Sequence, residues 1–284
     1  MTARVLDGRA VAAEIRRELA VEAERLAGLG RRPGLAAVLV GDDEPSRIYV
    51  GAKQRAAEST GFLSRVVNLP AASSQADVEA EVAALNADPA VHGIIVQLPL
   101  PAAIDPVTVQ EAIDPGKDVD ALHPVSEGRL LRGDPRFLPA TPAGIIELLR
   151  REKIEVDGAE VVIVGRGLLV GRPLAVMLSA KKPGANATVT QCHTGTRDLA
   201  AHTRRADVLV VAAGRLGVIT AGMVKPGAAV IDAGQHRTPG GLAGDVDPGV
   251  AEVAGALTPV PGGVGPMTVA MLLANTVEAA RAGE

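Results

Sequence analysis

Short, entirely apolar runs alternate with helical segments along this chain, and this alternation restricts the fold more than any other feature of the sequence. The run GLAAVLV at 34–40 and the run VVIV at 161–164 carry no polar side chain. Strands that are apolar on both faces are typical of parallel sheets, because helices cover both faces of such sheets. The sequence therefore predicts an α/β protein with parallel strands.

The alternation occurs twice, and the two halves carry different motifs. A segment rich in proline, glycine and aspartate at 114–140 separates them and is expected to be a connection. We therefore expect a first α/β domain at 1–140, joined by a C-terminal helix at 266–284, and a second domain at 141–265. Predicted helices cover 7–30, 45–60, 74–86, 142–152 and 267–282, and predicted strands cover 34–40, 65–69, 93–98, 161–164, 187–191, 207–212 and 228–232.

The composition favours a packed core and argues against several classes of partner. Hydrophobic residues make up 47% of the chain and charged residues 22%, so extensive disorder is not expected. A net charge of −4 argues against nucleic acid or an anionic membrane surface as a partner. Cys192 is the single cysteine, so no intrachain disulfide can form and a cytoplasmic location fits. No apolar stretch resembles a signal peptide or approaches the roughly 20 residues of a membrane span.

A glycine-rich turn follows the predicted strand at 161–164. Gly165, Arg166 and Gly167 come directly after the strand, and a helix is expected to begin at Gly171. Such a turn lets backbone N–H groups at a helix N-terminus approach a phosphate, so it favours a dinucleotide site. The alternative is an ordinary strand–turn–helix corner.

The next predicted strand, at 187–191, indicates which dinucleotide binds. NAD sites usually carry an acidic residue after this strand to bind the ribose hydroxyls, and none is present. Thr194 and Arg197, together with Arg166, would suit an additional phosphate. NADP is therefore the predicted cofactor.

Tyr49 and Lys53 lie four residues apart on the predicted helix at 45–60, so they share one face of it. Tyr49, the only tyrosine of the chain, can stack on a flat ring while Lys53 reaches a reacting atom. A lysine acts as a base only where burial or a nearby cation favours the neutral amine. The alternative is a solvated lysine on a helix surface.

Three further segments suit a ligand site. Gln97 lies at the carboxyl end of the predicted strand at 93–98, where α/β sheets bind ligands. The charged segment 117–120 lies in a loop, and the loop at 258–266 is rich in glycine and proline, which makes a rigid wall that a substrate can approach closely. The alternatives are a glutamine bonded to a loop, a solvated turn and a linker. The five histidines show no metal-ligand spacing, so no metal site is predicted.

These motifs also occur in a set order. The chain carries YVGAK, GIIVQLPLP, KDVDALHP, VGRGLLVGRP, VIDAG, GDVD and TPVPGGVGPMT in turn. The set closely resembles the bifunctional methylenetetrahydrofolate dehydrogenase/methenyltetrahydrofolate cyclohydrolase family over about residues 5–282. The resemblance implies an N-terminal α/β domain for the folate, a Rossmann-type NADP domain and a final helix that returns to the first domain. It also implies a homodimer formed through the nucleotide domain.

The resemblance implies roles for individual residues. Lys53 matches the catalytic lysine, needed mainly for the cyclohydrolase step, and Gln97 matches the glutamine that bonds to it. Tyr49 matches the tyrosine that stacks on the folate, and Asp120 matches the aspartate that holds the pterin ring. Further substrate-contacting positions are matched by Val96, Leu98, Pro261, Gly262, Gly263, Val264 and Gly265, and cofactor-contacting positions by Gly165, Arg166, Gly167, Thr194 and Gln235.

Three departures from the family pattern lie near the expected cofactor. Gly167 stands where the family usually has serine, so one hydroxyl contact is missing. Thr194 replaces a serine found in many relatives. Gln235 and His236 follow VIDAG, where the family usually has an aliphatic residue or threonine and then asparagine. These departures bear on the preference for NADP over NAD and leave Lys53 untouched.

The implied activity is oxidation of 5,10-methylenetetrahydrofolate to 5,10-methenyltetrahydrofolate with NADP, followed by hydrolysis to 10-formyltetrahydrofolate. Another two-domain NADP dehydrogenase, acting on a small hydroxy or amino acid, is expected to pair a histidine or arginine with an acid. A non-catalytic relative is expected to lack Lys53 or Gln97. A dehydrogenase without cyclohydrolase activity is a further alternative within the family.

Overall fold

The structure, a computed structural model, describes residues 2–282, which divide into two compact units. The unit that comprises 13–140 and 269–282 is called the three-stranded unit, and the unit that comprises 2–12 and 141–268 is called the six-stranded unit. Met1 and the last two residues of the C-terminal helix expected at 266–284 lie outside the described residues. Both units contain a parallel sheet and helices, which confirms the predicted α/β class.

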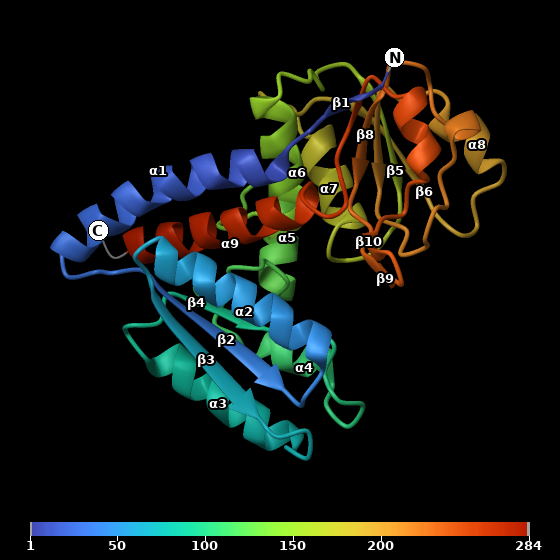
Figure 1. The fold of residues 1–284 in the computed structure, drawn as a ribbon. Coiled ribbons are helices and arrows are strands. Elements are labelled where there is room, and N and C mark those ends of the chain that lie inside the picture. Colours follow the sequence, from blue (N-terminus) through green and yellow to red (C-terminus); the bar gives the residue numbers. More distant parts are fainter. Residues whose placement is uncertain (1, 283–284) are drawn as a thin grey trace. The chain divides into compact units, whose positions relative to one another are not determined.

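The three-stranded unit is built around β2 (Gly34–Val40), whose seven residues are all buried. β2 pairs in parallel with β3 (Leu63–Leu69) on one side and with β4 (Gly93–Val96) on the other. α2 (Glu44–Ser59) and α3 (Gln75–Ala87) lie on opposite faces of this sheet (Figure 1). Because helices cover both faces, an uninterrupted apolar sequence suits β2.

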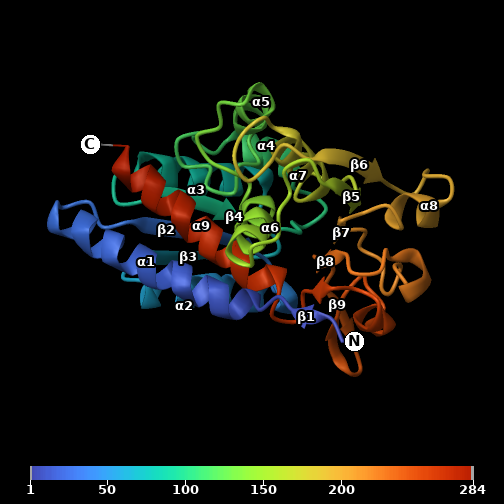
Figure 2. The same cartoon turned by 90° about the horizontal axis from the view of Figure 1, so that it is seen from above.

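Alternate residues of β2 contribute to two separate cores. The odd-numbered residues of 35–39 pack with α1 (Gly8–Gly28), α2 and α9 (Val264–Arg281). The even-numbered residues of 36–40 pack with α3 and α4 (Pro106–Glu111). On the first of these faces α1 and α9 run side by side (Figure 2), so the beginning and the end of the chain both cover β2.

The sheet of the six-stranded unit is parallel throughout, in the order β1–β11–β8–β7–β5–β6. β5 (Glu160–Val164) lies between β6 and β7, so the chain passes from β5 to β6 on one side and then crosses over to β7 on the other side of β5. Such a reversal creates a crevice at the carboxyl ends of the strands, where α/β proteins bind ligands. The other strands are β1 (Arg4–Val5), β6 (Thr188–Cys192), β7 (Val208–Val211), β8 (Ala229–Asp232) and β11 (Ala256–Leu257), and an antiparallel hairpin joins β9 (His236–Thr238) to β10 (Gly241–Ala243).

Helices connect these strands. α7 (Gly171–Ser179) begins after the glycine turn at the predicted residue and contacts β5 and β6. The other helices are α6 (Ala140–Arg151), α8 (Leu199–Thr203) and the 3-10 helices Ala221–Met223 and Pro248–Glu252. None of the helices described within residues 2–282 is both long and apolar enough to cross a membrane.

One segment predicted to be a connection is partly helical. Within 114–140 the structure contains α5 (Pro124–Arg132). The His123 ring accepts a hydrogen bond from the Val125 backbone N–H at 3.0 Å, and Gly133 ends the helix with a φ of 81°. Proline and glycine therefore mark the two ends of a helix here.

The structure also differs from the prediction at four other places. Residues 2–12 belong to the six-stranded unit, because β1 pairs in parallel with β11, whereas the sequence predicts them in the first domain. β4 ends at Val96, two residues before the predicted end, and α9 begins inside the loop predicted at 258–266. The hairpin of β9 and β10 was not predicted, since strands of two or three residues carry too little pattern to be detected.

An ion-pair cluster joins α1 to α9. The Glu22 carboxylate accepts hydrogen bonds from Arg25 at 2.9 Å and from Arg281 at 2.8 Å. These guanidinium groups lower the pKa of Glu22 from 4.5 to about 2. A carboxyl group with a lowered folded-state pKa stabilises the fold above its unfolded pKa, and that stabilisation is lost as the pH falls through the folded pKa.

We expect Glu22→Gln to lower the urea midpoint of unfolding above pH 4.5, with a deficit that shrinks as the pH falls toward about 2. The deficit is expected to be small and to decrease with salt, because the pair is exposed to solvent. Urea unfolding at a series of pH values measures it. Glu24→Gln, an exposed change on the same helix, is the control. A deficit of the same size at every pH would contradict the assignment.

Candidate active site

Lys53 and Gln97 meet in the three-stranded unit. Lys53 lies on α2, and Gln97 follows the carboxyl end of β4. Lys53 Nζ donates a hydrogen bond to Gln97 Oε1 at 3.2 Å, and Gln97 Nε2 donates to the Leu98 carbonyl at 2.7 Å. Because only the nitrogen of the amide can donate to a carbonyl, the bond to Leu98 turns the amide oxygen toward Lys53. The partner of Lys53 is therefore neutral and has a fixed orientation.

Tyr49 lies one turn before Lys53 on α2, and 41% of it is exposed. The start of this helix is well defined. Pro45 stands in its first turn, and the Asp43 carboxylate accepts hydrogen bonds from the Ser46 backbone N–H at 2.9 Å and from the Ser46 hydroxyl at 2.6 Å. The capped helix thus presents a partly exposed ring one turn from the amine of Lys53.

The charged segment 117–120 has more structure than a solvated turn. Lys117 Nζ donates to three carbonyl oxygens at the end of α3, those of Leu85 at 3.1 Å, Asn86 at 2.8 Å and Asp88 at 2.8 Å. The Leu85 carbonyl also accepts the Asp88 N–H, and the Asp88 carbonyl accepts the Val91 N–H. The ammonium group adds a further donor at the carboxyl end of the helix and so caps it. Burial lowers the pKa of Lys117, and the carboxylates of Asp114 and Asp88 oppose that shift.

Asp118 organises the loop that follows. Its side chain is buried and accepts hydrogen bonds from the backbone N–H groups of Leu122 at 3.1 Å and His123 at 2.9 Å. It also accepts from the Ser126 hydroxyl at 2.6 Å, and its backbone forms a β-bridge to Ile94 on β4. The segment is thereby attached to the strand that leads to Gln97.

Asp120 lies at the end of this braced segment and is half-buried. Burial raises the pKa of Asp120, the charge of Lys53 opposes the shift, and the charge of Asp118 adds to it. Lys53 is thus close enough to Asp120 to influence its ionisation. The structure therefore brings Lys53, Gln97 and Asp120 together within one unit, with Tyr49 on the same helix as Lys53.

The flanking residues of Gln97 have different surroundings. Val96 is 4% exposed and packs in the core that contains α3 and α4. Leu98 is half-buried and accepts the hydrogen bond from Gln97 through its backbone oxygen. The Val96 side chain therefore serves the core of the unit, whereas the Leu98 backbone orients Gln97.

A cavity of about 510 Å³ occupies the crevice of the six-stranded unit. It lies where β5, β6 and β7 end, at the point where the strand order reverses. Gly165 has a φ of 138°, and a Cβ atom there would lie 2.2 Å from the Ala212 carbonyl oxygen. Only glycine fits this close approach of β5 to β7, so the turn leaves room for a phosphate beside the start of α7.

Four of the predicted cofactor residues line this cavity, and two do not. The lining residues include Gly165, Arg166, Gly167 and Thr194, whereas Arg197 is exposed and does not line it. Gln235 lies instead against the loop at 259–265, and a Cβ atom on Gly265 would be 2.9 Å from its Nε2. The predicted substrate residues Pro261, Gly262, Gly263, Val264 and Gly265 line that same small hollow beside Gln235.

Sequence reasoning missed the part of the lining that follows β7. Residues 212–215 and His193 contribute to the cavity, and Arg215 adds a second guanidinium group to that of Arg166. The position of Arg215 in the sequence could have indicated this role, because it follows the carboxyl end of a predicted strand, where α/β sheets bind ligands. A glycine turn, a helix N-terminus and two guanidinium groups fit the phosphates of a dinucleotide.

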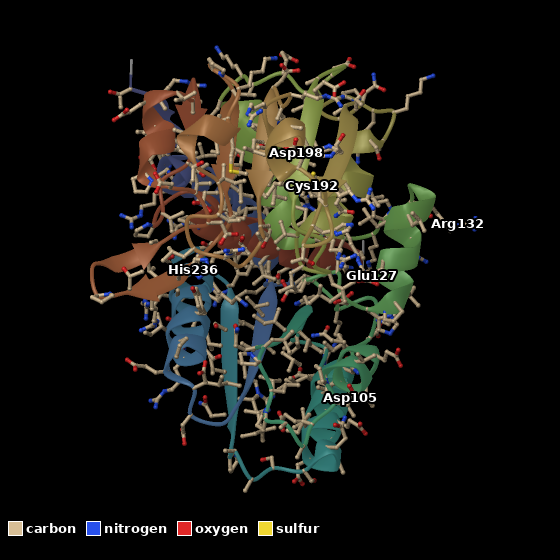
Figure 3. All side chains as sticks on the ribbon, turned by 90° about the vertical axis from the view of Figure 1, so that its right-hand side faces the viewer. Asp105, Glu127, Arg132, Cys192, Asp198 and His236 are labelled. Carbon is tan, nitrogen blue, oxygen red and sulfur yellow. The ribbon has the colours of Figure 1, made fainter. Side chains whose placement is uncertain are left out.

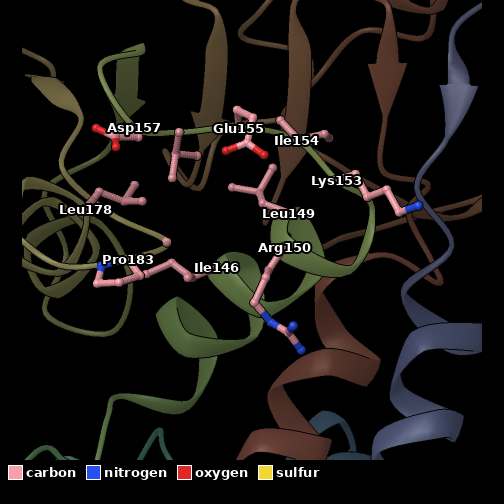
Figure 4. Close-up of a pocket in the computed structure, with 11 residues that line it drawn as sticks. Ile146, Leu149, Arg150, Lys153, Ile154, Glu155, Asp157, Leu178 and Pro183 are labelled. Carbon is pink, nitrogen blue, oxygen red and sulfur yellow. The ribbon is translucent and has the colours of Figure 1, made fainter.

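A second cavity, of about 300 Å³, lies beside the loop that precedes β5 (Figure 4). Its lining is largely apolar, with Ile146, Leu149 and Leu178 among the contributors and the Glu155 and Asp157 carboxylates at its rim. It adjoins the amino ends of the strands, which are the ends that α/β sheets do not use for cofactors. No group of three or more His, Cys, Asp or Glu side chains within residues 2–282 is arranged to hold a metal ion.

Comparison with known proteins agrees with this geometry. Residues 6–120 match the family model for the tetrahydrofolate dehydrogenase/cyclohydrolase catalytic domain, and residues 139–284 match that for the NAD(P)-binding domain of the same family. The chain belongs to the tetrahydrofolate dehydrogenase/cyclohydrolase family. This membership confirms the resemblance inferred from the ordered motifs.

Relatives match this chain along nearly its whole length. The bifunctional protein FolD of Syntrophus aciditrophicus is 54% identical over 99% of this chain and 98% of its own length. The crystal structure of the FolD dehydrogenase/cyclohydrolase from Campylobacter jejuni matches with a TM-score of 0.95 and 43% identity, covering 99% of this chain and 100% of that one. The Trypanosoma brucei dehydrogenase-cyclohydrolase, in complex with NADP cofactor and an inhibitor, matches with a TM-score of 0.93 and 42% identity over 100% and 99% of the two chains.

The two glycines of the turn are expected to respond differently to substitution. Gly165→Ala places a methyl group 2.2 Å from a backbone oxygen at a positive φ, whereas a Cβ atom at Gly167 meets nothing within 4 Å. We expect Gly165→Ala to cost about 1–3 kcal/mol of unfolding free energy and to weaken NADP binding at least tenfold. Gly167→Ala is the matched control. Its free energy of unfolding should stay close to that of wild type, and its affinity for NADP should stay within about twofold. Urea unfolding and calorimetric NADP titration measure the two effects, and equal behaviour of the two variants would refute the assignment of the turn.

Asp120→Asn is expected to stabilise the protein at neutral pH. Because the folded-state pKa of Asp120 is raised, the unfolded chain ionises first as the pH increases from 3.8, and this carboxylate makes the fold less stable above that window. We expect the variant to melt roughly 2 °C higher at pH 7, with no difference below pH 3.8. Thermal unfolding at both pH values is the measurement, with Asp134→Asn, an exposed change in the same unit, as control. A lower melting temperature at pH 7 would show that Asp120 supports the fold.

Proposed function

We propose that this chain oxidises 5,10-methylenetetrahydrofolate to 5,10-methenyltetrahydrofolate with NADP and hydrolyses the product to 10-formyltetrahydrofolate. The observation that carries the proposal is the group formed by Lys53, Gln97 and Asp120 in a member of this family. Lys53 is the strongest candidate for moving protons, and its partner is an amide that holds it in place without adding charge.

The hydrolytic step needs proton transfers and no electron acceptor. Water adds to the one-carbon bridge of the methenyl cation and loses a proton, which leaves a hydroxyl group on that carbon. The bond from the carbon to N5 then breaks, N5 takes up a proton, and the hydroxyl loses its proton as it becomes the formyl C=O. Lys53 serves these transfers in our proposal, and Gln97 positions its amine. Asp120 accepts hydrogen bonds from N–H groups of the pterin, and Tyr49 stacks on that ring.

In the oxidative step, bound NADP supplies the acceptor for the hydride that leaves the one-carbon unit. The protein contributes by binding the nucleotide and the folate in an orientation that allows hydride transfer between them. We assign nucleotide binding to Gly165, Arg166, Gly167 and Thr194, with Arg215 added from the cavity lining. Arg197, Gln235 and the residues 261–265 stay candidates for contacts outside that cavity.

We also propose a division of labour along the chain. The three-stranded unit, which holds most of the segment predicted at 1–140 and most of the C-terminal helix, binds the folate, and the six-stranded unit binds the nucleotide. The family membership supports a homodimer that works in the cytoplasm on tetrahydrofolate derivatives, in one-carbon metabolism. Neither nucleic acid nor a membrane is part of this proposal, consistent with a net charge of −4.

The proposal is tested by two assays on the purified chain. Reduction of NADP and of NAD is followed with methylenetetrahydrofolate, and hydrolysis of methenyltetrahydrofolate is followed without nucleotide. We expect both reactions, and faster reduction of NADP than of NAD. Absence of both reactions would refute the proposed function, whereas dehydrogenation alone would place the chain among dehydrogenases without cyclohydrolase activity.

Lys53→Met is expected to reduce hydrolysis at least 100-fold, because no other group in the described site replaces its proton transfers. NADP affinity should stay unchanged, because the cofactor cavity lies in the six-stranded unit. Arg55→Met removes an exposed cation from the same helix and is the matched control. Hydrolysis rates and calorimetric NADP titration are the measurements. Hydrolysis at the wild-type rate in Lys53→Met would exclude this role.

A further inference from the structure

Two motifs singled out in the sequence, VIDAG at 230–234 and GDVD at 244–247, interlock in the six-stranded unit. Asp232 Oδ1 accepts hydrogen bonds from the backbone N–H groups of Gly234 at 2.9 Å and Asp245 at 3.0 Å. Its Oδ2 accepts from the Val246 N–H at 3.0 Å. The carboxylate at the end of β8 therefore holds both segments together.

Packing makes this arrangement rigid. A Cβ atom on Gly244 would lie 1.8 Å from Asp232 Oδ2, and a Cβ atom on Gly234 would lie 2.4 Å from Asp245 Oδ1. Each aspartate thus sits directly against a glycine of the opposite segment. Neither segment can move far without a collision, so changes at one of them are transmitted to the other.

Asp245 connects this pair of segments to the cofactor cavity. It is fully buried, and its Oδ2 accepts hydrogen bonds from the backbone N–H groups of Ala213 at 2.6 Å and Gly214 at 2.9 Å. Ala213 and Gly214 line the cavity at the end of β7. One carboxylate oxygen thereby fixes the backbone of one cavity wall.

The other oxygen of Asp245 faces a histidine. His236 Nε2, on β9, lies 2.6 Å from Asp245 Oδ1, and Figure 3 marks His236 on this hairpin. A carboxylate can only accept, so the histidine nitrogen is the donor. An asparagine at this position would also carry an N–H donor, on a shorter side chain.

We propose that His236 is a positioning residue for the cofactor: through Asp245, it fixes the orientation of the Ala213–Gly214 backbone in the wall of the nucleotide cavity. Without the imidazole, a buried carboxylate oxygen loses its donor, and leaving such a group unsatisfied is costly. The carboxylate then turns toward another donor and releases the two N–H groups that it holds. The inference rests on the proposed function, because it assigns His236 a role in NADP binding and none in hydrolysis.

The experiment compares three variants of the full chain. His236→Leu removes the donor, and His236→Asn keeps an N–H donor. Arg237→Leu changes the next residue of the same strand, which is exposed, and is the matched control. For each variant, KM and kcat are measured with NADP varied and with folate varied, hydrolysis is measured without nucleotide, and NADP binding is titrated by calorimetry.

We expect His236→Leu to raise the KM and the Kd for NADP roughly tenfold, with hydrolysis and the KM for folate within twofold of wild type. His236→Asn should recover most of the loss, and Arg237→Leu should match wild type. An unchanged Kd for NADP in His236→Leu, no recovery in His236→Asn, or loss of both activities or of the folded state would overturn the proposal. If wild type itself lacks both activities but His236→Leu still weakens NADP binding, the proposed function fails and this inference stands.

Discussion

Buried carboxylates that accept backbone N–H groups hold the loops on which both parts of the site depend. Asp118 does this in the three-stranded unit, where it binds the backbone at Leu122 and His123. Asp232 and Asp245 do it in the six-stranded unit, next to the cofactor cavity. Each carboxylate stays buried only because two or more donors satisfy it, and the same donors fix the conformation of an otherwise irregular loop.

Because buried carboxylates fix these loops, the residues that contact ligands differ from the residues that hold the loops in place. In the segment 117–120, Lys117 caps α3, Asp118 braces the loop and Val119 is buried, while Asp120 lies within electrostatic reach of Lys53. The burial that raises the pKa of Asp120 is therefore supported by its neighbours in sequence. A site of this kind stores unfavourable interactions at one residue and offsets them with favourable ones at adjacent residues.

Sequence reasoning succeeded where a pattern was long or uniformly buried. The strand at 34–40 was predicted with its observed bounds because all of its residues are buried, and the helix after Gly171 follows a turn that only glycine can form. It failed for α5, because Pro124 and Gly133 suggested a loop although they mark helix ends, and for β1 and the β9–β10 hairpin, which are too short to show a period. The hydrogen bond between Lys53 and Gln97 joins residues 44 positions apart, so only the fold reveals it, and the role of Lys53 stays a prediction.

The shared core under α1 and α9 has a consequence for biosynthesis. Leu272, Leu273, Val277 and Ala280 come from the last helix, yet they pack with β2 in the core of the three-stranded unit. A nascent chain that has emerged only as far as residue 140 therefore exposes part of one face of this sheet, and that apolar face stays open to water until α9 has been made. The three-stranded unit is thus completed only after residues 141–268 of the other unit have been synthesised.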